Sequence, residues 1–242
     1  NRWGYLLHAR LRIIDLDPRA NQPFQREHGH LCFNGEIYNY LELRQRLARV
    51  GERFTTESDT EVLAALLAQY GLNKIDDCEG MWAFAWLDDS GLVLSRDRFG
   101  EKPLYLYEDA TGIYFGSEPK FIFALLGQRL PINVDHLYRY LVNGYKSLYK
   151  QRQTFFLGLQ ELKPGTWLKV DPAGRHQSQP YWQPKFDQYQ ENLSFEEAVS
   201  AAQAALINSV RLRLRADVPI AFCHRREMYN KAWKAIDIHK LN

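Results

Sequence analysis

Apolar and polar residues alternate along several short segments, and this alternation predicts β-strands that bury one face. The segments are residues 5–16, 31–40, 81–87, 92–95, 104–107 and 113–115. In the second of them, apolar residues flank Asn34-Gly35 on both sides. This dipeptide is typical of a two-residue hairpin turn, because both turn positions need a positive φ.

Other segments carry apolar residues at helical spacing. One predicted helix begins after Asn39 and ends at Gly51, and a second begins at Ser58 and ends at Gly71. Ser58-Asp59-Thr60-Glu61 has the pattern of a capping box. Further helices are predicted over residues 119–126, 135–143 and 194–215, with an extended portion over residues 155–170. Strands that alternate with helix pairs, and antiparallel hairpins among them, predict an α+β layered domain.

Composition and charge exclude several classes of protein. The chain is 45% hydrophobic and 25% charged, as globular proteins are, and its net charge of +2 gives no argument for nucleic acid or a membrane surface as partner. No apolar stretch approaches the length of a membrane span. Three widely spaced cysteines without a CxxC pair or a secretory leader favour a cytoplasmic location.

Several residues leave two interpretations open on spacing alone. Asn34-Gly35 is either a turn or a pair of donors for a developing oxyanion. Glu36 is either a surface strand residue or a carboxylate that binds an ammonium or an amide. Asp59 is either a helix cap or a ligand for an amino group that the helix end keeps ionised.

Arg10 is harder to explain as a purely structural residue, because arginine is rarely buried unpaired and a bidentate carboxylate partner would account for it. His8 is interpreted as a satisfied core histidine. His28 and His30 lack a third ligand nearby, so no metal site is expected. The motifs GxxxxGK[ST], GxGxxG and GxSxG are absent.

Eight stretches, taken in order along residues 7–222, carry a family resemblance. They are LHARLRIIDL, QPF, FNGEIYNYLELR, SDTEVLAALLAQYG, CEGMWAFAWLD, LSRDRFGEKPLYL, YFGSEPKFI and ADVPIAF. The set resembles the glutamine-hydrolysing asparagine synthetases, whose amino-terminal domain is a class II (N-terminal nucleophile) glutamine amidotransferase. The resemblance implies a four-layer α/β/β/α sandwich over residues 1–180 and a linker over residues 181–193. The first helix and strand of an α/β synthetase domain would follow over residues 194–222, then a divergent tail over residues 223–242.

The resemblance also implies a glutamine site. Arg10 would bind the glutamine carboxylate, with backbone contacts from Ile13 and Ile14. Asn34 and Gly35 would form the oxyanion hole. Glu36 and Asp59 would hold the α-amino group. Four further residues would lie near the path of ammonia to the second domain: Arg96, Asp97, Arg98 and Lys102. Glu118 and Lys120 fall in another matching block without an assigned role, and Arg12 replaces a small polar residue of the family pattern.

Two departures from the family pattern lead us to expect an inactive fragment. The family nucleophile is an amino-terminal cysteine, where this sequence opens with Asn1-Arg2-Trp3, and Cys223-His224-Arg225 replaces the pyrophosphate-binding Ser-Gly-Gly-x-Asp-Ser loop. No cofactor is expected in the fragment itself. The full-length parent is expected to use ATP and Mg²⁺, to hydrolyse L-glutamine to glutamate and ammonia, and to amidate aspartate or a related carboxylate. A homodimer is among the assemblies that the resemblance allows.

Three alternatives remain beside asparagine synthesis. The first is an amide-transferring paralogue that acts on a sugar acid or a surface polymer. The second is a non-catalytic binding module that kept the sandwich. The third, a class II domain of the phosphoribosyl or glucosamine-phosphate type, fits less well because the RDRFGEKPLYL and ADVPIAF stretches match the asparagine synthetase pattern.

Overall fold

The computed structural model describes residues 4–145, 153–185 and 193–220. Its larger sheet is antiparallel throughout and has the strand order β1-β2-β3-β4-β8-β9. These strands are β1 (Phe24–Arg26), β2 (Gly29–Ile37), β3 (Gly80–Asp88), β4 (Gly91–Arg96), β8 (Thr166–Val170) and β9 (His176–Pro180). The smaller sheet consists of β6 (Gly112–Gly116), β5 (Tyr105–Asp109) and β7 (Gln160–Glu161), also antiparallel.

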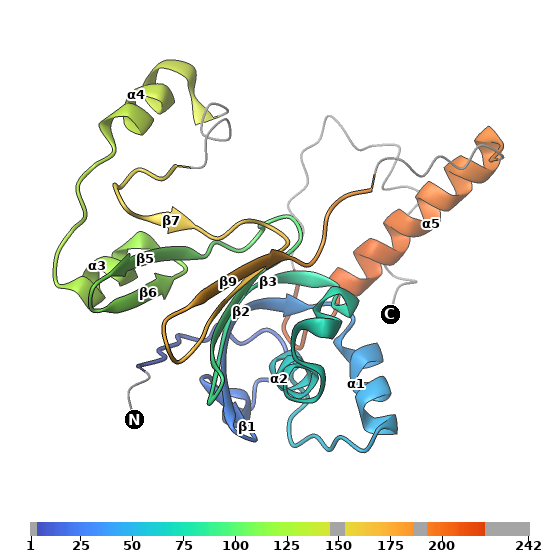
Figure 1. Ribbon diagram of the computed structural model, residues 1–242. Helices are drawn as coiled ribbons and strands as arrows, with labels where there is room; N and C mark the ends of the chain where they lie inside the picture. Colours follow the sequence, from blue (N-terminus) through green and yellow to red (C-terminus); the bar gives the residue numbers. More distant parts are fainter. Residues whose placement is uncertain (1–3, 146–152, 186–192, 221–242) are drawn as a thin grey trace.

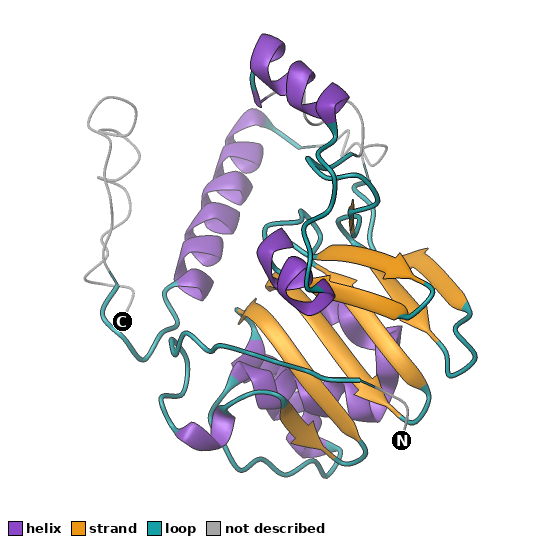
Figure 2. Ribbon diagram, turned by 90° about the vertical axis from the view of Figure 1, so that its left-hand side faces the viewer, coloured by secondary structure: helices purple, strands orange, loops and turns teal. Residues whose placement is uncertain are grey.

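The two sheets and their helices form four layers. The helices are α1 (Tyr40–Arg49), α2 (Asp59–Tyr70), α3 (Pro119–Leu126), α4 (Val134–Asn143) and α5 (Phe195–Arg213), with 3₁₀ turns η1 (Pro18–Ala20) and η2 (Gly71–Asp77). α1 and α2 cover one face of the larger sheet, the smaller sheet lies over its other face, and α3 packs on the outside of the smaller sheet (Figures 1 and 2). The predicted α+β fold, a four-layer α/β/β/α sandwich, is therefore confirmed.

Side-chain alternation along the central strands explains this layering. On β3, Trp82, Phe84 and Trp86 enter the core beneath α1 and α2. Ala83 and Ala85 point the other way, into a smaller apolar cluster between the two sheets. Because a strand presents successive side chains to opposite faces, one strand supplies large residues to the helix side and small ones to the space between the sheets. That space therefore stays open enough to hold a site.

The hairpin predicted at Asn34-Gly35 is wrong, because β2 runs straight through both residues. Asn34 pairs with Ala83 and Gly35 with Trp82 on β3. A Cβ on Gly35 would lie 2.1 Å from the carbonyl oxygen of Met81, so only glycine fits. The glycine therefore serves a close approach of two strands, with no need for a positive φ.

The strand predicted over residues 5–16 is also not formed, although its alternation is real. Leu6, His8 and Arg10 are half-buried, while Tyr5 and Leu7 are exposed, so alternate side chains do face the protein. The segment crosses the molecule without joining either sheet (Figure 2). Alternation reports which side chains face inward, whereas a strand also needs a hydrogen-bonding neighbour.

The predicted helices agree with the structure, and side-chain caps explain where α2, α4 and α5 begin. Ser58 accepts a hydrogen bond from the Glu61 N–H at 3.1 Å and begins α2. Ser194 and Glu197 form both halves of a capping box at the start of α5. No residue of α5 is buried, and none of the helices in the described ranges is long and apolar enough to cross a membrane.

The strand predicted over residues 216–222 is not seen in its described part, residues 216–220, which form no strand. Its last residues, and the whole predicted tail over residues 223–242, lie outside the described residues, as does part of the predicted linker. The domain boundaries therefore stay predictions.

Candidate functional site

A cavity of about 1350 Å³ opens between the two sheets. Its walls come from residues 4–11, 13 and 14, the middle of β2 and β3, β6 and α3. All seven residues that the resemblance assigns to glutamine binding line this one cavity: Arg10, Ile13, Ile14, Asn34, Gly35, Glu36 and Asp59. The fold thus brings together residues from three separate parts of the sequence.

Arg10 binds the loop that follows it. Its Nη2 donates to the carbonyl oxygens of Ile14 at 2.8 Å and Asp15 at 2.6 Å, and its Nη1 donates to the Asp17 carbonyl at 3.2 Å. Within the described part of the chain, no carboxylate pairs with this guanidinium, so the expected carboxylate partner is not a protein residue. The Nε–H and one Nη1–H remain available to a ligand.

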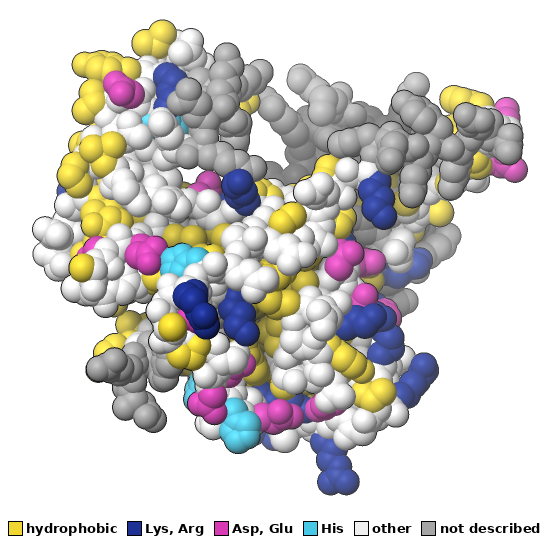
Figure 3. Space-filling view, viewed as in Figure 1, with side chains coloured by type: hydrophobic (Ala, Val, Ile, Leu, Met, Phe, Trp, Pro, Cys, Tyr) yellow, Lys and Arg dark blue, Asp and Glu magenta, His cyan; other side chains and the backbone are white. Residues whose placement is uncertain are grey.

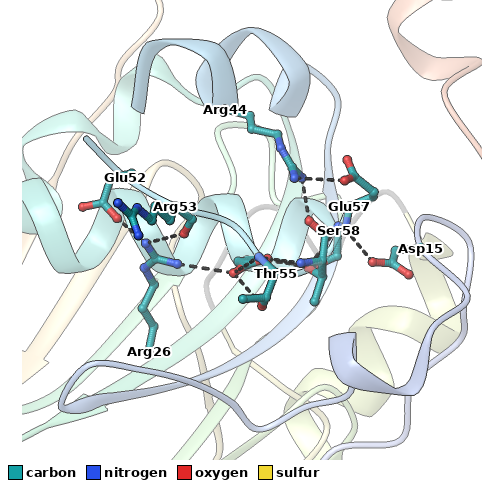
Figure 4. A network of polar contacts seen from close by, with 10 residues as sticks. Asp15, Arg26, Arg44, Glu52, Arg53, Thr55, Glu57 and Ser58 are labelled. Atoms are coloured by element: carbon teal, nitrogen blue, oxygen red, sulfur yellow. Dashed lines mark hydrogen bonds and ion pairs between the residues drawn. The ribbon is translucent and has the colours of Figure 1, made fainter. Parts of the chain in front are cut away.

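The loop over residues 13–17 is held in an unusual conformation. Asp15 is a buried non-glycine residue with a φ of +58°, a region that such residues rarely adopt. Its carboxylate accepts hydrogen bonds from the Glu57 N–H at 2.7 Å and the Asp17 N–H at 2.9 Å. Figure 4 shows Asp15 against the backbone of Glu57, beside the network that precedes α2. Surrounding bonds therefore hold the backbone of Ile13 and Ile14 in place.

The same network holds the loop that leads into α2. Glu61 is buried, and its carboxylate accepts hydrogen bonds from the N–H groups of Thr55 and Thr56. Arg26 donates to Glu61 at 3.4 Å and pairs with Glu52 (Figure 4). The loop before α2 is thus built on a buried carboxylate, and the first residue of the helix has a defined position.

Asp59 is that first residue, and its carboxyl group is buried. Its Oδ2 accepts a hydrogen bond from the Ile37 N–H at 3.0 Å, at the end of β2. Burial raises the pKa of Asp59 to about 7, although this hydrogen bond and the positive charge of Arg10 act in the opposite direction. A positively charged ligand beside this carboxylate would stabilise its charged form and lower its pKa.

The cavity face of β2 carries Cys32, Asn34 and Glu36. The Asn34 Nδ2 donates to the Ser117 hydroxyl at 3.1 Å, which leaves its second N–H for a ligand. Burial raises the pKa of Glu36, and the nearby charge of Lys102 partly offsets this rise. Burial also raises the pKa of the Cys32 thiol to about 11, so this cysteine is not an activated nucleophile.

Two cavity residues were missed or misinterpreted from the sequence. The Nε2 of His8 lies 3.1 Å from the Phe33 carbonyl oxygen, while its buried Nδ1 has no partner among the described residues. The interpretation as a satisfied core histidine is therefore wrong. Burial lowers the pKa of His8. Gln22 accepts a hydrogen bond from the Phe33 N–H at 2.5 Å, next to Asn34. The only sequence indication of Gln22 was its place in the QPF stretch.

The RDRFGEKPLYL stretch divides between structural and cavity residues. Asp97 is fully buried and accepts hydrogen bonds from four backbone N–H groups. Arg96 donates to the carbonyl oxygens of Gly100 and Lys102 in the same turn and to that of Leu162. Arg98 pairs with Asp76 near the surface. Of the four residues expected near an ammonia path, Lys102 alone lines the cavity.

On the cavity wall, Glu118 forms an ion pair with Lys120 at 2.7 Å. Both side chains are more than half exposed, so the pair adds little to stability. Across residues 4–145, 153–185 and 193–220, no group of three histidine, cysteine, aspartate or glutamate side chains is arranged to hold a metal ion.

Comparison with protein families decides what kind of domain holds this cavity. The family model described as a glutamine amidotransferase domain matches residues 2–182. The chain belongs to the glutamine amidotransferase family. Since this is a family of enzymes, the cavity with its carboxylates, guanidinium and amide is the candidate active site of an amidotransferase domain.

Similar proteins cover most of the chain. It is 34% identical over 220 residues to Amidase chry2 of Gibberella zeae, a match that spans 88% of this chain and 32% of that protein. It is 32% identical over 215 residues to asparagine synthetase [glutamine-hydrolyzing] 1 of Bacillus subtilis, across 87% of this chain and 33% of that enzyme. The chain therefore spans about a third of the length of these curated relatives.

Among solved structures, the glutamine phosphoribosylpyrophosphate amidotransferase of B. subtilis is similar to the chain with a TM-score of 0.47 and 23% identity. That similarity covers 64% of this chain and 30% of the other.

Proposed function

We propose that this chain binds L-glutamine in the cavity between its sheets, as the glutamine site of an amide-transferring enzyme. The observation that carries the proposal is the complementary chemistry of one cavity wall. Arg10 offers cationic donors for a carboxylate, Asp59 and Glu36 offer carboxylates for an ammonium, and Asn34 offers an amide N–H. An α-amino acid with a side-chain amide carries these three groups.

The arrangement supports a specific orientation of the substrate. The carboxylate of glutamine would accept a hydrogen bond from one of the free N–H groups of Arg10 and contact the backbone of Ile13 and Ile14. Its ammonium would approach Asp59, whose carboxylate forms no ion pair within the described part of the chain and accepts a hydrogen bond from the Ile37 N–H. The side-chain amide would then point along β2 toward Asn34 and Gly35.

Asn34 and Gly35 would act on charge that develops during the reaction. Attack of a nucleophile on the carboxamide carbon converts its carbonyl oxygen to an oxyanion, which preorganised N–H donors stabilise. The free Asn34 Nδ2–H and the Gly35 backbone N–H are the donors that we assign. Among the described residues we assign no cysteine nucleophile, because burial raises the pKa of the Cys32 and Cys78 thiols to about 11 and about 12.

For the whole protein we propose glutamine-dependent synthesis of asparagine, supported by the similarity to asparagine synthetases of B. subtilis. The ammonia released from glutamine would amidate aspartate in an ATP-dependent and Mg²⁺-dependent step. The similarity to proteins named amidases supports a second candidate, an enzyme with a different acceptor. Full-length protein supplied with amide-¹⁵N glutamine, ATP and either aspartate or other carboxylates distinguishes the two by the mass of the labelled product.

Glutamine binding itself is testable with this chain. L-Glutamine titrated into the folded chain in a calorimeter is expected to bind with one-to-one stoichiometry, and L-glutamate to compete. D-Glutamine is the control. With the opposite configuration at the α-carbon, its carboxylate and its ammonium cannot reach Arg10 and Asp59 at the same time. Equal affinity for both enantiomers, or no heat from either in a chain with a cooperative unfolding transition, would contradict the proposal.

The pH dependence of binding follows from Asp59. Its pKa of about 7 means that the carboxyl group is neutral below pH 7 and charged above it. The glutamine ammonium favours the charged form, so affinity is expected to fall as the pH drops below 7, by up to about tenfold per pH unit. Titrations between pH 5.5 and 8.5 measure this slope.

The Asp59→Asn variant is the control for this slope. Asparagine keeps an acceptor for the Ile37 N–H but cannot ionise, so affinity should be weak and independent of pH over this range. A wild-type affinity that stays constant across the same range would show that Asp59 does not hold the ammonium.

A further inference from the structure

The segment that follows α5 returns to the glutamine cavity. α5 has no buried residue, yet residues 213–217 contact loops that are about 170 to 200 residues earlier in the sequence. Three side chains make these contacts: Arg213, Arg215 and Asp217. Their partners lie at and just before the start of α1, and in the loop over residues 13–17, of which Ile13 and Ile14 line the cavity.

Arg215 is the anchor of the segment. Its guanidinium donates to both carboxylate oxygens of Glu42 at 2.6 Å and to the Tyr38 carbonyl at 2.6 Å. Arg213 adds its guanidinium over the Tyr38 ring at 4.7 Å. A bidentate fork with a third bond to the backbone fixes position and direction better than a single surface ion pair does.

Asp217 makes the contact with the cavity loop. Its N–H donates to the Ile13 carbonyl at 2.9 Å, and its Oδ2 accepts a hydrogen bond from the Asp15 N–H at 2.7 Å. The two bonds bracket Ile14, whose side chain is buried and lines the cavity. Asp217 therefore holds the backbone on both sides of a glutamine contact.

The conformation that Asp217 holds is a strained one. Asp15 has a φ of +58°, and a non-glycine residue keeps such a conformation only when surrounding contacts impose it. Arg10 in turn is oriented by the carbonyls of Ile14 and Asp15. A change in the loop would therefore turn both the backbone contacts and the guanidinium away from the ligand.

We propose that Asp217, anchored by Arg215, is a positioning residue for glutamine: it holds Ile13, Ile14 and Asp15 in the conformation that orients Arg10 toward the cavity. This inference rests on the proposed glutamine site. Asp217 touches no substrate in this scheme, and it acts through the loop. Because coupling between two sites is reciprocal, bound glutamine should in turn stabilise the contact between the loop and Asp217.

The test compares glutamine affinity in full-length variants of this chain. Asp217→Ala removes the acceptor for the Asp15 N–H and is expected to weaken glutamine binding by about threefold to tenfold. A hydrogen bond to a charged group contributes on this scale, and water takes over part of it because Asp217 is exposed. Asp217→Asn keeps an acceptor oxygen and should restore most of the affinity. Asp89→Ala, an exposed aspartate in the turn between β3 and β4, is the matched control and should bind as the unchanged chain does.

Hydrogen exchange separates positioning from a general loss of structure. In Asp217→Ala, exchange of the Asp15 amide should speed up while amides paired between β2 and β3 keep their protection. In the unchanged chain, glutamine should slow exchange of the Asp217 amide, which donates to Ile13. A loss of protection across β2 and β3 would show that the variant is merely destabilised and would overturn the positioning role.

The remaining outcomes distinguish this inference from the proposed function. If glutamine binds and Arg10→Ala abolishes binding, but Asp217→Ala binds as the unchanged chain does, the positioning role is wrong and the glutamine site stands. If the unchanged, folded chain binds no glutamine, the site and the positioning role both fail.

Discussion

Asp97→Ala is expected to lower the free energy of unfolding by about 4 kcal/mol, the scale at which removal of a buried charged partner destabilises a fold. The Asp97 carboxylate is fully buried and accepts hydrogen bonds from the N–H groups of Trp82, Phe99, Glu101 and Lys102 at 2.9–3.2 Å. Alanine would leave these donors without a partner, away from water. The backbone carbonyl of Asp97 also accepts a hydrogen bond from the Gly165 N–H, so the turn joins β3, β4 and the start of β8.

Urea unfolding, monitored by the fluorescence of the tryptophans, measures this loss as a change in midpoint at constant slope. Asp171→Ala is the matched control. The Asp171 carboxylate accepts from the Ala173 N–H, the Arg175 N–H and the Arg175 Nε, a similar number of bonds in an exposed turn. Water can replace these partners, so the midpoint should stay nearly unchanged. Equal losses in both variants would show that burial of the Asp97 carboxylate is not the cause.

Arg10→Ala is expected to weaken glutamine binding by at least about 30-fold, because truncating one member of a hydrogen-bonded charge pair typically costs about 2–5 kcal/mol. The variant loses the cationic donors for the glutamine carboxylate. It also frees the Ile14, Asp15 and Asp17 carbonyls that the guanidinium now holds. Calorimetric titration with L-glutamine measures the loss.

Arg12→Ala is the matched control for this variant. Arg12 lies two positions away on the exposed side of the same segment and makes one hydrogen bond, to the Leu16 carbonyl at 3.2 Å. Arg12→Ala removes one positive charge, as Arg10→Ala does, but leaves the cavity wall intact. Glutamine affinity should therefore change little. If Arg10→Ala and Arg12→Ala weaken binding equally, a general electrostatic attraction explains the effect and Arg10 is no specific ligand.

Sequence patterns predicted helices and strands correctly where contacts between near neighbours in the chain decide them. Helical spacing and caps predicted α1, α2, α3, α4 and α5, and alternation predicted β3, β4, β5 and β6. Such features depend on neighbours within a few residues of one another, as in the capping box of Ser194 and Glu197. The family resemblance added the layered fold and brought forward Arg10, Asn34 and Asp59.

Hydrogen-bond partners across the fold could not be derived from local pattern. Asn34-Gly35 has the composition of a turn. Only the structure shows why the glycine stands inside a strand: a Cβ added at Gly35 would lie 2.1 Å from the Met81 carbonyl oxygen on β3. His8 was misinterpreted because a sequence does not reveal that one ring nitrogen faces Phe33 and that the other has no partner in the described part of the chain.

By itself, the sequence determined the order of helices and strands, the balance of charge and the identity of the residues that could bind an amino acid. Only the tertiary structure decided that Arg10, Asn34 and Asp59 share one cavity. It also decided that the Asp97 carboxylate accepts hydrogen bonds from the backbone of β3 and of the turn after β4. It alone decided that Asp217 reaches Ile13 and Asp15 across about 200 residues of chain. Periodicity and caps arise from contacts along the chain, whereas a site arises from contacts between segments that only the packed layers bring together.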